Sequence, residues 1–356
     1  MNKIFRGDSW KLASELSDES VDCVVTSPPY WGLRDYGVDG QAGLEGHPQK
    51  WVDKMVELCE LLKPKLKKSG VMFWNIGETY FGNSSYSEEG RQGYEEKTGM
   101  MMNASKAIRT GLPDPKLPER LRAREQFKGV KNNWLQVKQL LGLPWRFAIA
   151  MQDKGWILRN SIIWHKPNAM PSSVKDRFGN CYEYVFMFVK SKRYYFDLDA
   201  VREPHQSGIR AKFNIRVCEV QKGRSEARLG SVASKEEIEM YDEQEMCGSV
   251  INSIGKNPGD VWRITTKPHA FAHFAVFPEE LTERMIKCGC SKNGLVLDPF
   301  MGSGTVAVVA KRLGRQYLGF ELNEEYIKIA ERRLAGVMDW GVMRDVDAGL
   351  QRTLND

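Results

Sequence analysis

The sequence predicts an α/β fold built on a mainly parallel sheet, and two patterns along the chain support this. Short apolar runs rich in β-branched residues, which suit strands buried on both faces, alternate with amphipathic segments of helical period. Near the C-terminus, residues 295–334 read as strand, glycine-rich loop, helix, strand and helix, which is a complete βαβ unit of the Rossmann type. The length of 356 residues allows one large or two medium domains.

The N-terminal part starts this alternation. Residues 1–30 predict a short strand, a helix and a second strand, "VDCVV", that runs into "TSPPY". The next segment, "HPQKWVDKMVELCELLKPKLKKSG", has helical apolar spacing, and Gly70 is a plausible helix stop. The run "VMFWNIG" then predicts another buried strand.

The middle of the chain is less regular. Residues 81–133 are polar, glycine-rich and aperiodic, which predicts a long, mobile insertion. The segment "NWLQVKQLLGLPWRFAIAMQDKGW" predicts a pair of helices with a turn near Gly142, and "ILRNSIIWHK" and "YEYVFMFVKSKRYYF" predict two strands. From 199 to 257 periodicity weakens, and residues 202–228 carry seven basic against three acidic side chains. Such a segment suits either a phosphate backbone or a solvated surface loop.

The C-terminal βαβ unit predicts a nucleotide-like ligand. Gly302 and Gly304 allow close approach of a ligand to the backbone at a helix start, and Glu321 ends the next strand, where a carboxylate accepts ribose hydroxyls. The third glycine of a dinucleotide fingerprint is replaced by Ala307, and the lysine of a P-loop is missing. An adenosine-type ligand without a pyrophosphate remains, and S-adenosylmethionine fits that description. The alternative is a purely structural glycine turn.

Composition excludes several classes of protein. Hydrophobic residues make up 42% and charged residues 28%, as in ordinary globular proteins. The sequence has no apolar run long enough to span a bilayer and no signal-peptide core, so we expect a cytoplasmic protein with no membrane partner. The seven cysteines and five histidines lack ligand spacing, so we expect no metal. The net charge of +6 permits a polyanionic partner without demonstrating one.

Two motifs together resemble the amino-methyltransferases of DNA: "TSPPY" at 26–30 and "DPFMGSGT" at 298–305. Their order, with the Pro-Pro motif first, resembles the circularly permuted β group of that family. The resemblance implies a Rossmann-like, S-adenosylmethionine-dependent methyltransferase fold with a mainly parallel seven-stranded sheet. It also implies a catalytic half at 1–198, a target-recognition region at 199–257, a cofactor-binding half at 258–340 and a tail at 341–356.

The resemblance also assigns cofactor contacts. "FRGDS" resembles the element whose acid reaches the adenine, which makes Asp8 a candidate, and "HFAVFPEEL" resembles the segment that packs on the methionine part. The expected cofactor-binding residues are Asp8, Phe277, Pro278, Asp298, Pro299, Phe300, Gly302, Ser303, Gly304, Thr305 and Glu321.

An exocyclic amino group is a poor nucleophile because its lone pair is delocalised into the ring. Hydrogen-bond acceptors on its two N–H bonds pull the nitrogen toward sp3 geometry and free that lone pair. We expect the Ser27 hydroxyl and the Pro28 carbonyl to accept these bonds, with Pro29 holding the turn rigid. We expect Tyr30 to stack on a base flipped out of the duplex, and the reaction needs no covalent cysteine.

In this family Ser-Pro-Pro-Tyr tends to accompany N4 of cytosine, so the resemblance implies a site-specific cytosine-N4 methyltransferase acting on double-stranded DNA. The alternatives are an adenine-N6 enzyme, an RNA or protein amino-methyltransferase, and an inactive DNA-binding protein. A cognate restriction endonuclease is a possible partner, and the chain is expected to be a monomer or a homodimer. Two groups of residues are candidates either for the base pocket or for ordinary packing: Trp31, Arg34, Asp35 and Tyr36, and Trp164, His165 and Lys166.

Overall fold

The computed structural model describes residues 2–33, 38–81, 134–136, 138–172, 174–204, 254–266 and 278–336. The chain divides into two compact units. One comprises Met1–Phe196 together with Asp260–Asp356, and the other is Asp197–Gly259. Whether the second unit recognises DNA stays a prediction, because residues 205–253 lie outside the described part of the chain.

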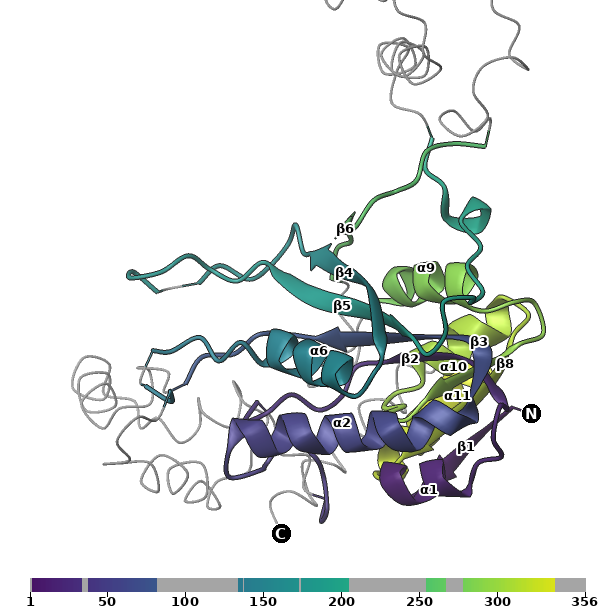
Figure 1. The fold of residues 1–356 in the computed structure, drawn as a ribbon, viewed down its shortest axis with the longest axis horizontal. Helices are drawn as coiled ribbons and strands as arrows, with labels where there is room; N and C mark the ends of the chain where they lie inside the picture. Colours follow the sequence, from purple (N-terminus) through teal and green to yellow (C-terminus); the bar gives the residue numbers. More distant parts are fainter. Residues whose placement is uncertain are drawn as a thin grey trace, which may run out of the picture. The chain divides into compact units, whose positions relative to one another are not determined.

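The first unit is built on an eight-stranded sheet in the order β1-β8-β7-β2-β3-β5-β4-β6 (Figure 1). Within this sheet only β5 runs antiparallel to its neighbours, β3 and β4. The predicted α/β class with a mainly parallel sheet is therefore confirmed. The resemblance implied seven strands, but the described sheet has eight; the short strand at its edge is the three-residue β6, which pairs with β4. The strands are β1 (Asn2–Arg6), β2 (Val21–Thr26), β3 (Leu66–Ile76), β4 (Ile157–His165), β5 (Tyr182–Val189), β6 (Val261–Arg263), β7 (Leu295–Asp298) and β8 (Gln316–Glu321).

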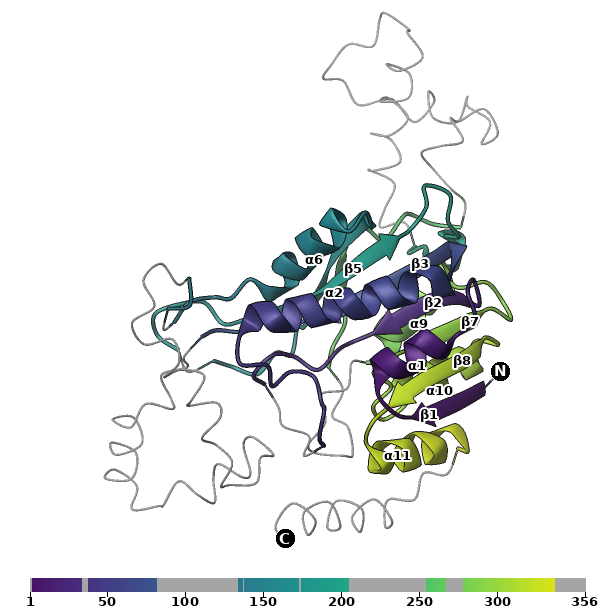
Figure 2. The same cartoon turned by 60° about the horizontal axis from the view of Figure 1, so that its bottom comes forward.

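Helices cover both faces of this sheet (Figures 1 and 2). On one face α1 packs on α2 and α2 on α6, and on the other α9 packs on α10 and α10 on α11. The helices are α1 (Ser9–Glu15), α2 (Pro48–Lys65), α6 (Leu143–Asp153), α9 (Glu279–Gly289), α10 (Thr305–Arg312) and α11 (Glu324–Leu334). In the part of the chain that the structure describes, no helix has the length and apolar character that crossing a membrane requires.

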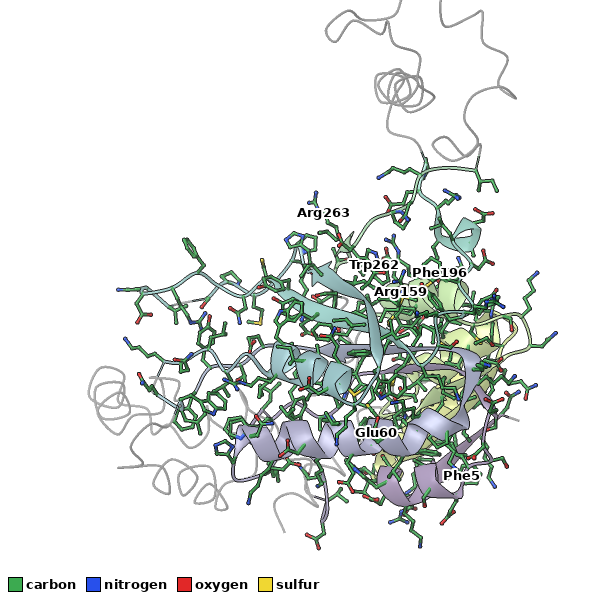
Figure 3. All side chains as sticks on the ribbon, viewed as in Figure 1. Phe5, Glu60, Arg159, Phe196, Trp262 and Arg263 are labelled. Atoms are coloured by element: carbon green, nitrogen blue, oxygen red, sulfur yellow. The ribbon has the colours of Figure 1, made fainter. Side chains whose placement is uncertain are left out.

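Most of the largest buried side chains belong to one cluster between the sheet and helices α2 and α6. Figure 3 draws the described side chains as sticks on the ribbon. Trp74 of β3 stacks on Phe147 of α6 with ring centroids 5.3 Å apart, and Phe188 of β5 meets Phe147 edge-on. Aromatic pairs of this kind add to the stabilisation that burial alone supplies. This packing fixes β3 and β5, two strands that carry side chains of the site described below, against a rigid layer.

Two boundaries predicted from sequence were wrong. Helix α2 ends at Lys65 and β3 begins at once with Leu66, so Gly70 lies inside the strand and does not stop the helix. The ladder with β2, which starts at Val21 opposite Leu66, overrides the helical pattern there. The predicted helix pair before residue 156 is a single helix, α6, and Pro144 stands in its first turn.

The described residues just before α6 pair with the segment after β3 instead of forming a helix. A bridge joins Tyr80 to Leu140, and the backbone N–H of Phe81 donates to Gln139 at 2.8 Å. Phe81, which the sequence assigned to the mobile insertion, is buried. Residues 82–133, the rest of that insertion, lie outside the described residues.

The strand order brings together the two sequence motifs. Strands β2 and β7 are parallel neighbours, with Cys23 opposite Val296 and Val24 opposite Leu297. Ser27, directly after β2, and Asp298, the last residue of β7, therefore meet at one edge of the sheet. The chain proceeds from β7 to β8 on one side and from β2 to β3 on the other, and open α/β sheets bind ligands at such a reversal of strand order.

In the second unit, the described residues flank the recognition-like segment. A short 3-10 turn covers Asp199–Val201, and Glu203 and Lys256 pair through both backbone hydrogen bonds. Arg202 donates to the carbonyl of Gly255 at 3.0 Å. These contacts bring the two ends of the segment together.

Candidate active site

A pocket opens at the carboxyl ends of β7, β8 and β2, and it encloses about 910 Å³ of space that is partly open to solvent. Its wall joins the glycine loop, the start of α1 and the first residue after β2. The lining residues are Asp8, Ser9, Trp10, Ser27, Pro29, Val38, Gly40, Gln41, Ala42, Pro299, Phe300, Gly302, Ser303, Phe320, Glu321, Leu322, Asn323 and Tyr326.

Glu321 ends β8 and presents its carboxylate to this pocket. Its Oε2 accepts the backbone N–H of Gly302 at 2.7 Å, and its Oε1 accepts that of Asn323 at 2.8 Å. Burial raises the pKa of this carboxyl, and the backbone donors oppose the shift. A carboxylate has about four lone-pair sites, so two remain for hydroxyl groups of a ligand.

Asp298 lies behind the pocket wall and is 1% exposed. Its Oδ1 accepts the hydroxyl of Thr26 at 2.6 Å and the backbone N–H of Phe300 at 2.9 Å. Burial raises the pKa of Asp298 to about 7. The Thr26 bond ties the end of β2 to the end of β7, so Asp298 fixes the position of Ser27 relative to the glycine loop.

The glycine loop is held from below by α11. Gly304 has φ +82°, and a Cβ there would lie 2.6 Å from the Cβ of Ala330, so only glycine allows the helix to pack this closely. Arg333 of α11 donates to the carbonyl of Ser303 at 2.7 Å and to the Thr305 hydroxyl at 3.1 Å. Sequence reasoning missed Arg333, because nothing in its local pattern indicates a contact with a loop some 30 residues earlier.

Of the expected cofactor-binding residues, six line the pocket: Asp8, Pro299, Phe300, Gly302, Ser303 and Glu321. Asp298, Gly304 and Thr305 support the loop without lining it, and Pro278 is the N-cap of α9. Asp8 also caps α1, because its Oδ1 accepts the backbone N–H of Lys11 at 3.0 Å. Phe277 lies outside the described residues.

Trp10 and the 38–42 segment complete the wall, and sequence reasoning did not single them out. The indole N–H of Trp10 is buried without a partner among the described residues, and its ring meets Phe300 edge-on at 6.0 Å. The free lone pairs of Glu321, beside glycine backbone at the start of a helix, fit a nucleoside with ribose hydroxyls.

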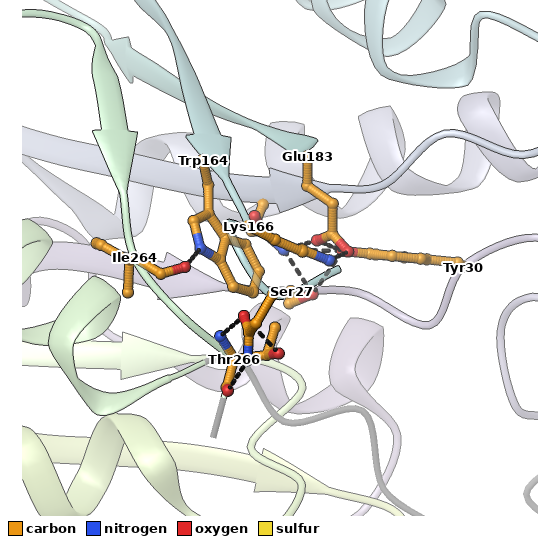
Figure 4. A network of polar contacts seen from close by, with 9 residues as sticks. Ser27, Tyr30, Trp164, Lys166, Glu183, Ile264 and Thr266 are labelled. Carbon is orange, nitrogen blue, oxygen red and sulfur yellow. Dashed lines mark hydrogen bonds and ion pairs between the residues drawn. The ribbon is translucent and has the colours of Figure 1, made fainter. Parts of the chain in front are cut away.

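Ser27 stands where this pocket meets a second polar cluster, shown in Figure 4. Its hydroxyl donates to the Tyr30 hydroxyl at 3.3 Å, and it accepts from Asn75 Nδ2 at 3.4 Å. Both distances lie beyond the usual range for strong hydrogen bonds, so Ser27 retains capacity for a ligand. Pro29 also lines the pocket, and its carbonyl accepts the indole N–H of Trp51 at 2.8 Å. Pro28 is buried and does not line it.

Tyr30 has its hydroxyl anchored in this second cluster. The hydroxyl donates to Glu183 Oε2 at 2.7 Å and accepts from Asn75 Nδ2 at 2.8 Å. Burial and the Glu183 carboxylate raise the pKa of Tyr30 well above its ordinary value, so the group is a neutral donor. A Cβ at position 77 would lie 2.7 Å from Tyr30 Cε2, so Gly77 makes room for the ring. The stacking role expected for Tyr30 stays a prediction.

Glu183 and Lys166 close the cluster. Lys166 forms an ion pair with Glu183 Oε1, and its ammonium lies 4.4 Å from the centroid of the Trp164 ring. Trp164 itself is buried and donates to the carbonyl of Ile264 at 2.9 Å, as an ordinary strand residue does. Sequence reasoning left Lys166 open and missed Glu183, because a single acid at the start of an apolar strand gives no local signal.

Other candidates named from the sequence have different roles or are not described. The indole N–H of Trp31 donates to the carbonyl of Glu45 at 2.7 Å, and its ring packs against the core. Arg34, Asp35 and Tyr36 lie outside the described residues. His165 ends β4, where it pairs with Tyr182 of β5 and Arg263 of β6. Within the described ranges, no three His, Cys, Asp or Glu side chains gather as metal ligands would.

Comparison with known structures supports the fold. The PvuII DNA methyltransferase, described as cytosine-N4-specific, matches with a TM-score of 0.57 at 19% identity, covering 100% of this chain and 95% of that one. A putative DNA modification methylase from Thermus thermophilus, complexed with S-adenosyl-L-methionine, matches with a TM-score of 0.52 at 20% identity, over 95% and 94% of the two chains.

Sequence comparison gives the family. The type II methyltransferase M.Cfr9I of Citrobacter freundii is 38% identical over 333 residues, which cover 94% of this chain and 87% of the relative. M.SmaI of Serratia marcescens is 35% identical over 332 residues, covering 93% and 90%. The N6/N4 methyltransferase family model, described as DNA methylase, matches residues 21–332. The chain therefore belongs to the N6/N4 DNA methylase family.

Proposed function

We propose that this DNA methyltransferase transfers a methyl group to N4 of cytosine in duplex DNA, with Ser27 as the acceptor that prepares the amino group. The observation that carries the proposal is the position of the Ser27 hydroxyl. It lines the pocket that contains Glu321 and the glycine loop, and it also belongs to the Tyr30–Glu183 cluster. A base amino group on Ser27 would therefore face the donor pocket.

S-Adenosylmethionine is the cofactor, and when bound it supplies an electrophilic methyl group. In the proposed arrangement Glu321 holds the ribose hydroxyls with the lone pairs that its backbone donors leave free. Asp8, Pro299 and Phe300 line the same pocket and are assigned to the adenosine part of the cofactor. Asp298 and Arg333 contact neither reactant; they hold the strand end and the loop in place.

The chain's own residues then act on the base. Ser27 Oγ accepts one amino N–H, and the Pro28 carbonyl is assigned the other, because the Pro29 carbonyl is already bonded to Trp51. Accepting both N–H bonds moves the nitrogen lone pair out of conjugation with the ring. The ring of Tyr30 is proposed to stack on the flipped base, which offsets part of the few kcal/mol that flipping costs.

Serine at the first position of the motif favours cytosine over adenine, as the family resemblance implies. Adenine N6 is the alternative, because the same acceptors would suit its amino group. Membership of a restriction–modification system, with a cognate endonuclease, is proposed from the type II relatives. The Asp197–Gly259 unit is proposed to read the DNA sequence.

Product identity tests the proposal. The purified chain is incubated with unmethylated genomic DNA and methyl-labelled S-adenosylmethionine, and the DNA is digested to nucleosides for mass spectrometry. We expect labelled N4-methylcytosine with no labelled N6-methyladenine. Labelled N6-methyladenine alone would contradict the assignment to cytosine, and label in RNA or protein but not in DNA would contradict the proposed substrate class.

A further inference from the structure

We propose that Glu183 and Lys166 are a positioning pair that fixes the direction of a hydrogen-bond chain running from Ser27 through Tyr30 to Glu183. In this chain the proton of the Ser27 hydroxyl points to Tyr30, and the Ser27 lone pairs are left for the substrate amino group. The inference rests on the proposed role of Ser27 as an acceptor. It adds the device that makes a serine, which can either donate or accept, behave as an acceptor.

The hydrogen-bond chain ends on Glu183, a group that can only accept. An ionised carboxylate has no proton to donate, and Glu183 uses both oxygens. Its Oε1 is paired with the ammonium of Lys166, and its Oε2 accepts from the Tyr30 hydroxyl at 2.7 Å and from Asn75 Nδ2 at 2.8 Å. The pair is largely shielded from water, with side-chain exposures of 16% for Glu183 and 20% for Lys166.

The direction of the Tyr30 hydroxyl follows from this end. A phenol has one proton, and Tyr30 donates it to Glu183. Its oxygen can then only accept from its other neighbours, and it does so from Asn75 at 2.8 Å and from Ser27 at 3.3 Å. Asn75 reinforces the direction, because turning its amide over would place a carbonyl oxygen against the Glu183 carboxylate.

The direction of the Ser27 hydroxyl is then biased. Tyr30 can only accept from Ser27, so the weak contact of 3.3 Å draws the Ser27 proton toward Tyr30 and away from the pocket that Ser27 also lines. The approach of Asn75 to Ser27 Oγ, at 3.4 Å, is too long to occupy the serine lone pairs strongly. An amino N–H arriving from the pocket therefore meets an acceptor, whereas a freely rotating hydroxyl would spend part of its time as a competing donor.

The sheet fixes the residues of the hydrogen-bond chain in space. Asn75 lies opposite Val185 in the β3–β5 ladder, and Glu183 lies opposite Trp164 in the β4–β5 ladder. Asn75 is 1% exposed, and the Tyr30 ring packs against the Cα of Gly77, where a Cβ would lie 2.7 Å from Tyr30 Cε2. Functional geometry supported by strands is more precise than geometry supported by loops. Glu183 touches no reacting atom in this arrangement, so it is a positioning residue and not a catalytic one.

Glu183→Gln tests the pair. The amide then faces Lys166 with its oxygen, and it faces Tyr30 and Asn75 with its N–H₂. Tyr30 can no longer donate to position 183, so its proton turns toward Ser27 or Asn75 and its oxygen no longer has to accept from Ser27. We expect the single-turnover rate of methyl transfer at saturating S-adenosylmethionine to fall about 10- to 100-fold, the usual cost of losing a group that orients a reactive one. The dissociation constant for S-adenosylmethionine should stay within about twofold, and the melting temperature should be close to that of the wild type, because the side chain keeps its size.

Two further variants give controls. Glu183→Asp keeps a group that can only accept, so we expect it to react faster than Glu183→Gln. Glu60→Gln is the matched control: Glu60 of α2 (Figure 3) also pairs with a lysine, Lys63, and accepts an indole N–H, from Trp156 at 2.8 Å. It lies outside the chain of bonds described here, so we expect a wild-type rate.

A double-mutant cycle gives the decisive readout. Tyr30→Phe keeps the ring for stacking but removes the hydroxyl that links Ser27 to Glu183. Because the link is then already lost, adding Glu183→Gln to this variant should slow the reaction less than about threefold further. If the two slowdowns multiply, or if Glu183→Gln reacts at the wild-type rate, the proposal is wrong. Loss of S-adenosylmethionine binding or of folding in Glu183→Gln, with Glu60→Gln intact, would equally reject it in favour of a structural role. The nucleoside made by the wild type, read from the same digests, tests the proposed function separately.

Discussion

The donor pocket and the Ser27 cluster lie side by side at one edge of the sheet, yet they are built in different ways. The donor pocket depends on main-chain groups: the two oxygens of Glu321 hold the backbone N–H groups of Gly302 and Asn323. The Ser27 cluster depends on side chains that bond to each other, and its members come from two strands, β3 and β5, and from the segments that follow β2 and β4.

This difference predicts different responses to mutation. A pocket made by the backbone tolerates changes in many side chains and fails when the loop cannot adopt its shape. A cluster of side chains keeps its fold when one member changes and loses the direction of its hydrogen bonds. We therefore expect variants of the first region to affect binding of S-adenosylmethionine and variants of the second to affect the methyl-transfer step.

The largest expected effect belongs to Ser27→Ala. Removing a preorganised group that stabilises developing charge costs about 10²–10³ in rate, so we expect a loss of this size in the single-turnover rate. Binding of S-adenosylmethionine, measured by calorimetry, should change less than twofold because Glu321 and the glycine loop are untouched. A parallel loss of binding and rate would show that the two regions are not separable.

Asp298→Asn tests the titration of the carboxyl that joins the two regions. The folded pKa of Asp298 is about 7, above the unfolded value of about 3.9, so the native state keeps a proton that the unfolded state has lost. Stability contributed by this group is therefore present below pH 4 and is lost as pH rises to 7. Between pH 5 and pH 8 we expect the wild type to lose roughly 2–3 kcal/mol relative to Asp298→Asn.

Urea unfolding of both proteins at the two pH values, without cofactor, measures this difference. The asparagine keeps the size of the side chain and the Oδ1 that accepts from Thr26 and Phe300. The two proteins therefore differ in the titrating group and not in packing. Identical pH dependence in the two proteins would show that Asp298 does not titrate in this range.

Glu321→Gln should affect the donor pocket alone. The amide has fewer acceptor sites for ribose hydroxyls, and hydrogen bonds to charged groups are worth about 1.5–3 kcal/mol. We expect the dissociation constant for S-adenosylmethionine to rise about 10- to 100-fold, on the same principle. At saturating S-adenosylmethionine the single-turnover rate should remain within a factor of three of the wild type. A slow reaction at saturation would assign Glu321 to the chemical step.

The smallest expected effects come from substituting one glycine in each region, Gly77 beside Tyr30 and Gly304 in the glycine loop. Gly77→Ala would push a Cβ to 2.7 Å from Tyr30, and Gly304→Ala would push one to 2.6 Å from Ala330 at φ +82°. We expect about a tenfold loss in each, below the 10² that a 1 Å misplacement can cost. Gly77→Ala should lower the rate and Gly304→Ala the cofactor affinity, and an exchange of these two phenotypes would reverse the proposed division of roles.

The same contrast explains what sequence reasoning could find. The glycine loop, Glu321 and the strands on either side are contiguous, so spacing and periodicity predicted them, and the α/β class was confirmed. Glu183, Lys166 and Asn75 meet Tyr30 only through the pairing of β3, β4 and β5. No local pattern encodes that pairing, so their joint cluster was missed. The two wrong boundaries, at Gly70 and before α6, also depended on strand pairing between distant residues.

In the proposed reaction Ser27 acts on the amino group and not on base flipping. The most direct test is the single-turnover rate of Ser27→Ala, relative to the wild type, on a duplex in which the methylated position, once mapped, is left unpaired. An unpaired base flips at little cost, so a role in flipping would largely disappear on this substrate. We predict that the defect of about 10²–10³ remains; recovery to within threefold of the wild-type rate would show that Ser27 acts in base flipping instead.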